Sequence, residues 1–174
     1  MSEQDPLSFE VFRSTGPDEH GRRRVHQLTP LYRSPFTCVF NPAQLTLTEP
    51  LTMAEICRHP HIHTSYTGDA PGLIDGVLTR LGLSRQVVAQ AATPLSIPFV
   101  VKQSPLLAVV PELITRLFVN HADLRILPVP EAELVLPIAS VSHRRDRANP
   151  LLHFVMAQVR EAMQELFGPG PDNG

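Results

Sequence analysis

The chain has 174 residues, of which 43% are hydrophobic and 18% are charged, and its formal net charge is −2 at pH 7. This length favours one compact domain with a substantial hydrophobic core, and the composition is ordinary for a globular protein. A net charge so close to zero gives the fold as a whole no electrostatic attraction for nucleic acid or for an anionic membrane.

The cysteines and the first residues bear on the compartment in which the protein works. Cys38 and Cys57 are the two cysteines of the sequence, and their separation matches no common metal or redox motif. We therefore interpret both as small hydrophobic side chains, buried or half-buried, in a reducing compartment. Residues 1–6 are polar and acidic, unlike a signal peptide, and no stretch is long and apolar enough to span a membrane. We expect a cytoplasmic protein.

Eighteen prolines predict many short elements with abrupt ends. Residues 1–30 are polar and show little periodicity, and we expect this segment to be poorly structured, apart from a short strand at 7–12. From residue 31 the character of the sequence changes. The nearly continuous apolar run 36–40 predicts a strand that is covered on both faces.

A short helix is predicted to begin after Thr52 and to end before Pro60. Thr52 and Glu55 have the spacing of a capping box, in which each side chain binds the other residue's free backbone N–H. Leu51 and Ile56 occupy the positions of a hydrophobic staple around this cap.

Helices and strands alternate through the rest of the chain. The next helix is predicted to have Asp69 as its N-cap, Pro71 in its first turn and Gly82 as its C-terminal stop. The last helix is expected to have Asn149 as its N-cap and Pro150 at its first position. Further strands are predicted at 61–66, 86–92, 106–110, 124–129 and 134–141, and further helices at 94–103 and from residue 111. This alternation predicts an α/β fold with a doubly wound, parallel sheet.

The usual signatures of catalysis and cofactor binding do not occur in this sequence. No glycine-rich phosphate loop follows a predicted strand, and there is no Gly-x-Ser-x-Gly turn. Neither cysteine has a plausible activating partner, and the carboxylates are scattered singly at predicted helix starts and in loops. We therefore expect no catalytic residues and no cofactor.

One cluster of histidines has to be weighed as a metal site. His59, His61 and His63 are spaced by two, so a strand would point all three imidazoles to the same side. Zinc or nickel could accept such an arrangement if a fourth ligand came from elsewhere. However, Pro60 interrupts regular strand geometry, and a histidine that simply forms a hydrogen bond at a strand edge is the commoner case. We expect no metal site here.

The predicted sheet itself indicates where a ligand would bind. In an open parallel sheet, ligands lie beyond the carboxyl ends of the strands, and two polar loops are predicted to follow such ends. The candidate ligand-binding residues are Ser65, Tyr66, Thr67, Thr93, Pro94, Leu95 and Ser96. The second loop also begins a helix, whose free N–H groups favour a carboxylate or a similar anion. The alternative is that Thr93 and Ser96 are only capping residues.

Many short stretches between about residues 31 and 165 together resemble a known family. They are Leu31–Phe40, Leu51 and Thr52 before Ile56, His59–Ile62, Gly68, Ile74 and Asp75, Leu78, Leu81–Arg85, Pro94–Pro98, Ala108–Glu112, Leu127–Pro130, His143–Arg145, and Asn149 with Pro150. In this order and spacing they resemble the C-terminal part of the effector-binding (substrate-binding) domain of LysR-type transcriptional regulators.

The resemblance implies a fold like that of the periplasmic binding proteins, in which two α/β subdomains close on a ligand. Residues 31–133 would form the second effector-binding subdomain, and 134–167 the strand and helix that return to the first, leaving 168–174 as a disordered tail. The two polar loops match positions that line the effector cleft of this family. The family's helix-turn-helix has no counterpart here, so we expect no direct DNA contact by this chain.

Three functions remain open at this stage. The first is a regulatory module that binds a small-molecule effector such as an organic acid, in a homo-oligomer. The second is an interaction protein that pairs with a full-length regulator. The last helix favours some partner, because its apolar stripe would lack its usual neighbour; the stripe comprises Leu151, Val155, Val159, Ala162 and Leu166. The third is an enzyme that uses the histidine cluster with a metal.

Overall fold

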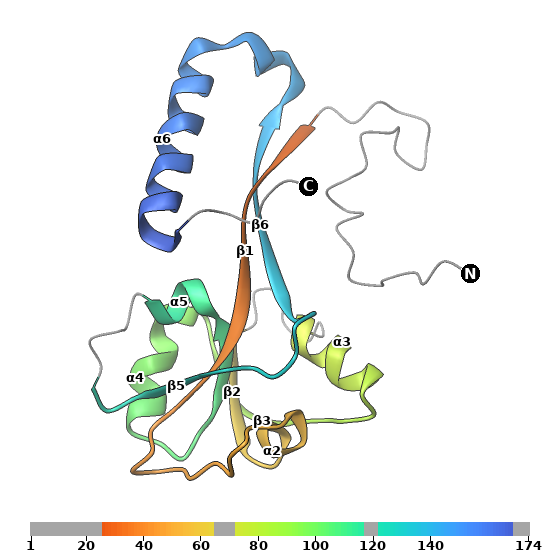
Figure 1. Ribbon diagram of the computed structural model, residues 1–174, viewed down its shortest axis with the longest axis vertical. Helices are drawn as coiled ribbons and strands as arrows, with labels where there is room; N and C mark the ends of the chain where they lie inside the picture. The colour runs from red at the N-terminus through yellow and green to blue at the C-terminus, as the bar shows by residue number, and fades with distance from the viewer. Residues whose placement is uncertain (1–25, 65–71, 117–121, 169–174) are drawn as a thin grey trace. The chain divides into compact units, whose positions relative to one another are not determined.

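The computed structural model describes residues 26–64, 72–116 and 122–168 (Figure 1). The strands are β1 His26–Phe40, β2 Pro60–Thr64, β3 Gln86–Ala91, β4 Ala108–Pro111, β5 Arg125–Pro128 and β6 Val135–His143. The α-helices are α2 Met53–Cys57, α3 Leu73–Arg80, α4 Ile97–Lys102, α5 Glu112–Arg116 and α6 Pro150–Phe167, with 3₁₀ turns η1 Pro94–Ser96 and η2 Arg144–Ala148. The chain divides into two compact units, one of residues 34–136 and the other of the residues before 34 and after 136.

The sheet of unit 34–136 is mostly parallel, with one reversed strand. β2 pairs with β3 in parallel, and a parallel bridge between His61 and Leu107 joins β2 to β4. β1 lies between β4 and β5 and runs antiparallel to both. The α/β class and the mostly parallel sheet are therefore confirmed. The expectation that β1 also runs parallel is wrong, because β1 enters this sheet at the edge where β4 ends, with Phe36 opposite Pro111.

Helices cover both faces of this sheet, and β1 contributes to both layers (Figure 1). Cys38 and Phe40 pack with residues of α2 and α3, whereas Val39 between them packs with residues of α4. This alternation follows from the two-residue period of a strand. The prediction from the apolar run 36–40, a strand covered on both faces, is confirmed.

The burial of Cys38 in this sheet also sets its chemistry. Its side chain is fully buried, and burial raises the pKa of its thiol to about 12. Cys57 is half-buried, and burial raises the pKa of that thiol as well. Neither cysteine forms a disulfide, and both are small side chains that are buried or half-buried, as the sequence predicted.

One of the two hydrogen bonds predicted for the N-cap of α2 is present. The Thr52 hydroxyl accepts a hydrogen bond from the Glu55 N–H at 3.0 Å, which confirms Thr52 as the N-cap. The return bond of the capping box is wrong, because the Glu55 carboxylate accepts instead from the backbone N–H of Thr48 at 3.0 Å. Leu51 packs against the same core cluster as Ile56, in keeping with the predicted staple.

The two ends of α3 differ in how well they follow the prediction. Asp69 and Pro71 lie outside the described residues, but Asp69 is not the N-cap: the helix is capped at Gly72, whose N–H donates to the Asp75 carboxylate at 3.0 Å. The C-terminal stop at Gly82 is confirmed. Its φ is +66°, and the N–H groups of Gly82 and Leu83 donate to the carbonyls of Thr79 and Leu78, which is a Schellman motif.

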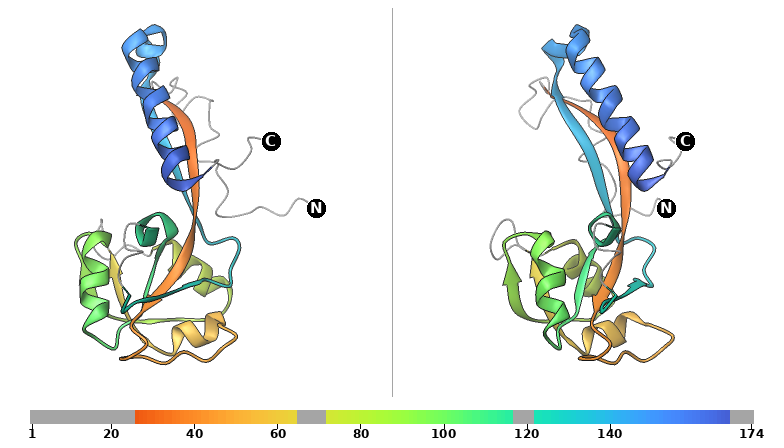
Figure 2. Two further views of the ribbon diagram at one scale, coloured as in Figure 1. Left: turned by 60° about the vertical axis from the view of Figure 1, so that its left-hand side comes forward. Right: turned by 90° about the vertical axis from the view of Figure 1, so that its left-hand side faces the viewer.

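The unit made of the chain's two ends contains α6, which lies alongside β6 and the first part of β1 (Figure 2). The predicted cap is confirmed, since Asn149 Oδ1 accepts from the Leu151 N–H at 3.0 Å and Pro150 begins the helix. The rings of Tyr32 and Phe167 lie 5.4 Å apart between their centroids and join β1 to the end of α6.

Over the residues that the structure describes, none of the helices combines the length and the apolar character needed to cross a membrane.

The helix end at Gly82 provides a test of the fold with a matched control. Gly82→Ala should lower the free energy of unfolding by about 1 kcal/mol, because alanine is strained at positive φ. Gly76→Ala, inside the same helix with open space where the new methyl would lie, should raise it by about 0.5–1 kcal/mol. Urea unfolding of both variants measures the difference, and equal effects would contradict the assignment of Gly82 as the helix stop.

Candidate functional site

The strands β2, β3 and β4 run in the same direction, so their carboxyl ends meet at one edge of the sheet, here called the carboxyl edge. β2 ends at Thr64, β3 at Ala91 and β4 at Pro111. The segments that follow these ends are residues 65–71, the turn η1 and the helix α5. A ligand of this sheet would bind against these segments.

The first predicted loop, Ser65, Tyr66 and Thr67, lies outside the described residues, so its role in ligand contact stays a prediction. The second loop forms the turn η1, where Thr93 Oγ1 accepts from the Leu95 N–H at 3.3 Å and the Ser96 hydroxyl donates to the Thr93 carbonyl at 2.8 Å.

Thr93 thus has the capping role that the sequence left as the alternative, whereas the Ser96 side chain forms no cap hydrogen bond to α4. Thr93 and Leu95 are exposed, and Pro94 and Ser96 are half-buried, so the turn also presents surface to a ligand. The cap by Thr93 does not decide ligand contact by Thr93–Ser96, which remains a prediction.

A groove of about 440 Å³ lies beside the end of β4, between α5 and the strands β1 and β5. Its lining residues are Pro35, Phe36, Thr37, Glu112, Thr115, Arg116, Ile126, Pro128, Val129, Glu131 and Ala132. Thr115 and Ile126 also line a small apolar cavity, and Pro94 of η1 lines the same cavity. This cavity therefore lies between η1 and the groove. The groove therefore belongs to the carboxyl edge.

The polar groups of the groove come from β1 and α5. The Thr115 hydroxyl donates to the Glu112 carbonyl at 2.9 Å and lies 3.4 Å from the hydroxyl of Thr37. Arg116 binds the Glu112 carboxylate through Nε at 3.0 Å and through Nη2 at 2.9 Å. This pair is partly exposed, so the guanidinium is held in place at the groove while water or a ligand can still reach it.

Sequence reasoning missed these groove residues. The signal was available, because Pro111 and Glu112 mark a strand that ends directly in a helix, and the rule for carboxyl ends applies to this third step as it does to the other two. Thr37 could not be found in that way, because it lies on the reversed strand β1 and reaches the edge through its pairing with Val110.

The three histidines of the cluster bind three different partners. His61 is buried, and its Nε2 lies 3.0 Å from the Ile56 carbonyl, to which it donates. His59 Nε2 contacts the Glu55 carboxylate at 3.3 Å, and His63 Nδ1 accepts from Arg85 at 3.2 Å. The described residues contain no group of three or more His, Cys, Asp or Glu side chains placed to hold a metal ion.

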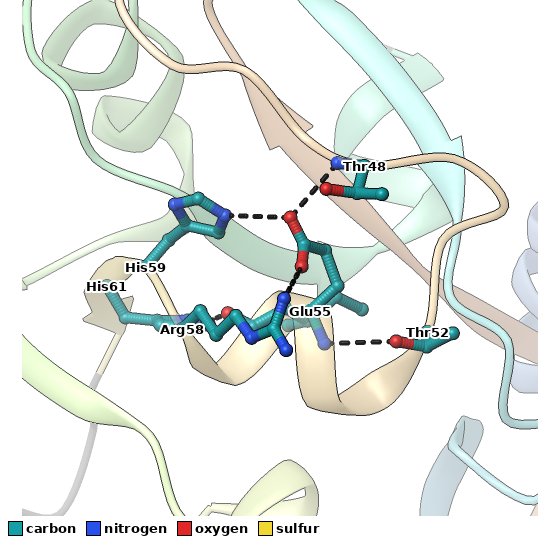
Figure 3. Close-up of polar contacts among 7 residues, drawn as sticks. Thr48, Thr52, Glu55, Arg58, His59 and His61 are labelled. Carbon is teal, nitrogen blue, oxygen red and sulfur yellow. Dashed lines mark hydrogen bonds and ion pairs between the residues drawn. The ribbon is translucent and has the colours of Figure 1, made fainter.

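Glu55 is the centre of the polar contacts around α2 (Figure 3). Its buried carboxylate accepts from the Thr48 N–H, contacts His59, and accepts from Arg58 Nη1 at 2.9 Å. The hydrogen bond from Thr48, together with His59, lowers the pKa of Glu55 to about 2. This charged carboxylate holds the loop before α2 to the helix and to the start of β2.

Asp75 and Arg85 form a second charged pair, next to His63. Arg85 donates from Nε at 2.7 Å and from Nη2 at 2.9 Å to the two carboxylate oxygens of Asp75, and its side chain is only 2% exposed. Burial acts to raise the pKa of Asp75, but the hydrogen bond and charge of Arg85 outweigh it and lower that pKa. The pair fixes the start of α3 against the start of β3.

The sequence model of the LysR substrate binding domain matches residues 16–164. The chain belongs to the LysR substrate-binding domain family. This family has a fold like that of the periplasmic binding proteins, so both the predicted resemblance and the predicted fold class are confirmed.

Individual relatives are transcriptional regulators. The transcriptional activator NahR of Pseudomonas putida is 25% identical over 143 residues, which cover 79% of this chain and 44% of NahR. The chain thus spans less than half the length of this curated relative.

Solved regulatory and effector binding domains have the same fold. The regulatory domain of the Pseudomonas aeruginosa activator MexT superposes with a TM-score of 0.68 at 18% identity, over 80% of this chain and 67% of that chain. The effector binding domain of QuiR, solved in complex with shikimate, superposes with a TM-score of 0.61 at 14% identity, over 81% of this chain and 66% of that chain.

The buried His61 predicts a specific loss of stability in acid. Burial lowers its pKa from 6.5 to about 4, so its contribution to stability is complete above pH 6.5 and is lost as the pH falls from 6.5 to 4. His61→Gln keeps a donor for the Ile56 carbonyl but cannot titrate. Between pH 7 and pH 4.5 the natural chain should lose on the order of 2 kcal/mol that this variant does not lose.

Urea unfolding at pH 7, 5.5 and 4.5 measures this difference. The exposed His153→Gln variant is the control and should keep the pH dependence of the natural chain. If the two variants lose stability in parallel, His61 is not the group that titrates.

Proposed function

We propose that this chain is the effector-binding, regulatory part of a LysR-type transcriptional regulator, with residues 31–133 as the effector-binding subdomain and 134–167 as the returning strand and helix. The effector is a small organic acid, bound at the carboxyl edge. The groove beside α5 is the observation that carries this proposal. The chain works in the cytoplasm without a cofactor, catalyses no reaction, and leaves DNA contact to other segments or chains.

The size and the chemistry of the groove support a small ligand. A volume of about 440 Å³ lies in the range of small-molecule sites, roughly 300–1,000 Å³. Its apolar side chains, such as Phe36 and Ile126, suit a carbon skeleton, and the hydroxyls of Thr37 and Thr115 can orient it. Arg116 is the group that would bind a carboxylate, since guanidinium groups pair with carboxylates in two parallel hydrogen bonds.

The two loops predicted from the sequence are candidates for further contacts with the effector. Ser65, Tyr66 and Thr67 follow β2 in the chain, and Thr93–Ser96 follow β3. QuiR, a protein of similar fold, is described with shikimate in its effector binding domain, which supports the class of ligand.

A second function, pairing with a full-length regulator, is favoured by α6. The apolar stripe predicted from the sequence is exposed on this helix, with Leu151, Val155 and Val159 among the exposed hydrophobic side chains. An apolar surface of this kind marks an interaction site.

The effector proposal is tested by thermal unfolding with a panel of aromatic and aliphatic carboxylates. An acid that binds only the folded chain stabilises it by about 2.7 kcal/mol at a hundred times its dissociation constant, so the melting temperature should rise with dose. Arg116→Gln should weaken the response about tenfold or more, because it removes the charge and the guanidinium group that would pair with the carboxylate.

Arg125→Gln is the matched control, since Arg125 also forms an exposed ion pair, with Glu49, but does not line the groove. This variant should respond to the acid as the natural chain does. The proposal is wrong if no acid raises the transition, and the groove is the wrong site if the Arg116 variant responds fully.

A further inference from the structure

Helix α5 begins without a capping side chain next to it in the sequence. Pro111, directly before Glu112, has no side-chain acceptor, and the first N–H groups of a helix have no acceptor within the helix. The side chain of an N-cap residue normally accepts one of these hydrogen bonds. Here the acceptor comes from β1, because the Ser34 hydroxyl oxygen accepts from the Leu113 N–H at 3.1 Å.

The Ser34 hydroxyl lies in the interior of its unit. The side chain is fully buried, and it is 79 positions away from Leu113 in the sequence. Water cannot easily take the place of an acceptor that is buried in this way. The hydrogen bond from Leu113 therefore fixes the first turn of α5 to one particular residue of β1.

A second hydroxyl of β1 contacts α5 further along the helix. Thr37 Oγ1 lies 3.4 Å from Thr115 Oγ1, and both side chains are buried. The Thr37 hydroxyl is also fixed to β4, because it lies 3.3 Å from the Val110 carbonyl. β1 therefore holds α5 at two places, at Leu113 through Ser34 and at Thr115 through Thr37.

These two contacts join two walls of the groove. Three residues of β1 and three of α5 line it, namely Pro35, Phe36, Thr37, Glu112, Thr115 and Arg116. Ser34 directly precedes the first three and does not line the groove itself. Its hydrogen bond therefore acts on the distance between the two walls from outside the site.

The first turn of α5 also determines where the guanidinium of Arg116 lies. The Glu112 carboxylate binds Arg116 Nε at 3.0 Å and Nη2 at 2.9 Å. Residues four apart are neighbours on one side of a helix, so a shift of the first turn moves Glu112 and the guanidinium that it holds. A group that binds a carboxylate through two parallel hydrogen bonds has to be held closely in place.

We propose that Ser34 is a positioning residue of the candidate effector site. Its hydroxyl holds the first turn of α5 against β1, and in this way it fixes the position of Arg116 and the width of the groove. Ser34 acts through Leu113 and Glu112 and does not touch the effector. This role rests on the proposed function, in which Arg116 binds the acid, but its effect on α5 can be measured without any ligand.

Hydrogen exchange of the full chain, followed by NMR, tests the effect on α5. Ser34→Ala removes the acceptor and keeps the backbone of β1, so the Leu113 N–H should exchange about fivefold faster or more. The Arg116 Nε–H should also exchange faster, because its ion pair with Glu112 loosens. Far-ultraviolet circular dichroism shows that the variant is folded.

A rescue variant separates capping from packing. Pro111→Ser places a hydroxyl directly before α5, where it can cap the helix locally. Added to Ser34→Ala, it should slow the exchange of the first-turn N–H groups and of Arg116 Nε–H again. If the Ser34 side chain only filled space, a new cap at position 111 would not have this effect.

Thr52→Ala is the matched control. The Thr52 hydroxyl caps α2 in the same way that Ser34 caps α5, since it accepts from the Glu55 N–H at 3.0 Å, but α2 does not line the groove. This variant removes an N-cap from the same unit and should leave the exchange of Leu113 and Arg116 unchanged.

Calorimetric titration with benzoate and benzamide tests the link to the effector. The two compounds have the same ring, but only benzoate has a carboxylate. Ser34→Ala should lower the preference for benzoate about fivefold, because Arg116 is no longer held in place. Pro111→Ser should restore this preference, and Thr52→Ala should not change it.

Three results would overturn the inference: exchange at Leu113 and Arg116 that Ser34→Ala leaves unchanged, a change that Pro111→Ser does not repair or that Thr52→Ala reproduces, or a preference for benzoate that survives in Ser34→Ala. Failure of the effector proposal gives another pattern, in which the natural chain binds neither compound while exchange at Arg116 still depends on Ser34. Ser34 then positions Arg116 as inferred, and only the proposed ligand is wrong.

Discussion

The register of β1 between β4 and β5 determines both the core and the candidate site. Side chains alternate along a strand, so this register directs Cys38 and Phe40 to the layer of α2 and α3, and Val39 to the layer of α4. A slip by one residue would exchange the two sets and break both layers. The same register sets Thr37 opposite Val110 and Pro128, where its hydroxyl meets Thr115. The packing of the core and the polar groups of the groove therefore depend on one constraint.

Buried charges fix the elements on the α2 and α3 side of the sheet. Glu55 binds a backbone N–H, a histidine and an arginine, and Asp75 binds Arg85 through both carboxylate oxygens. Each carboxylate links segments that the hydrophobic core alone would position less strictly, since apolar contacts have little directional preference. Substitution of one partner would leave a charge without compensation, which costs more than the pair contributes.

Much of the fold could be predicted from local sequence signals. The N-caps Thr52 and Asn149 and the helix stop at Gly82 all depend on residues within a few positions of the helix end, and the structure has all three. The predictions that failed concern features that depend on residues distant in the sequence or outside the helix. The direction of β1 depends on the edge at which the chain enters the sheet, and the partner of the Glu55 carboxylate is Thr48, which lies outside the helix.

The residues of the groove were missed for the same reason, and none of Thr93–Ser96 lines it. The rule for carboxyl ends selected the loops after β2 and β3, whose part in ligand binding stays a prediction, whereas Thr37 reaches that edge only through its tertiary pairing. Arg116 was missed because nothing in its local sequence distinguishes it from an ordinary basic residue near the end of a short helix. Its ion pair with Glu112 beside a concave surface is what marks it.

The burial of Cys38 makes this thiol a natural reporter of chain opening. With its pKa raised to about 12, this thiol stays protonated at neutral pH, and only the thiolate reacts with alkylating reagents. Because Cys38 lies at the centre of the sheet, alkylation requires β1 to leave its neighbours. The rate at which Cys38 is alkylated therefore measures how often the central strand separates, with no substitution in the chain.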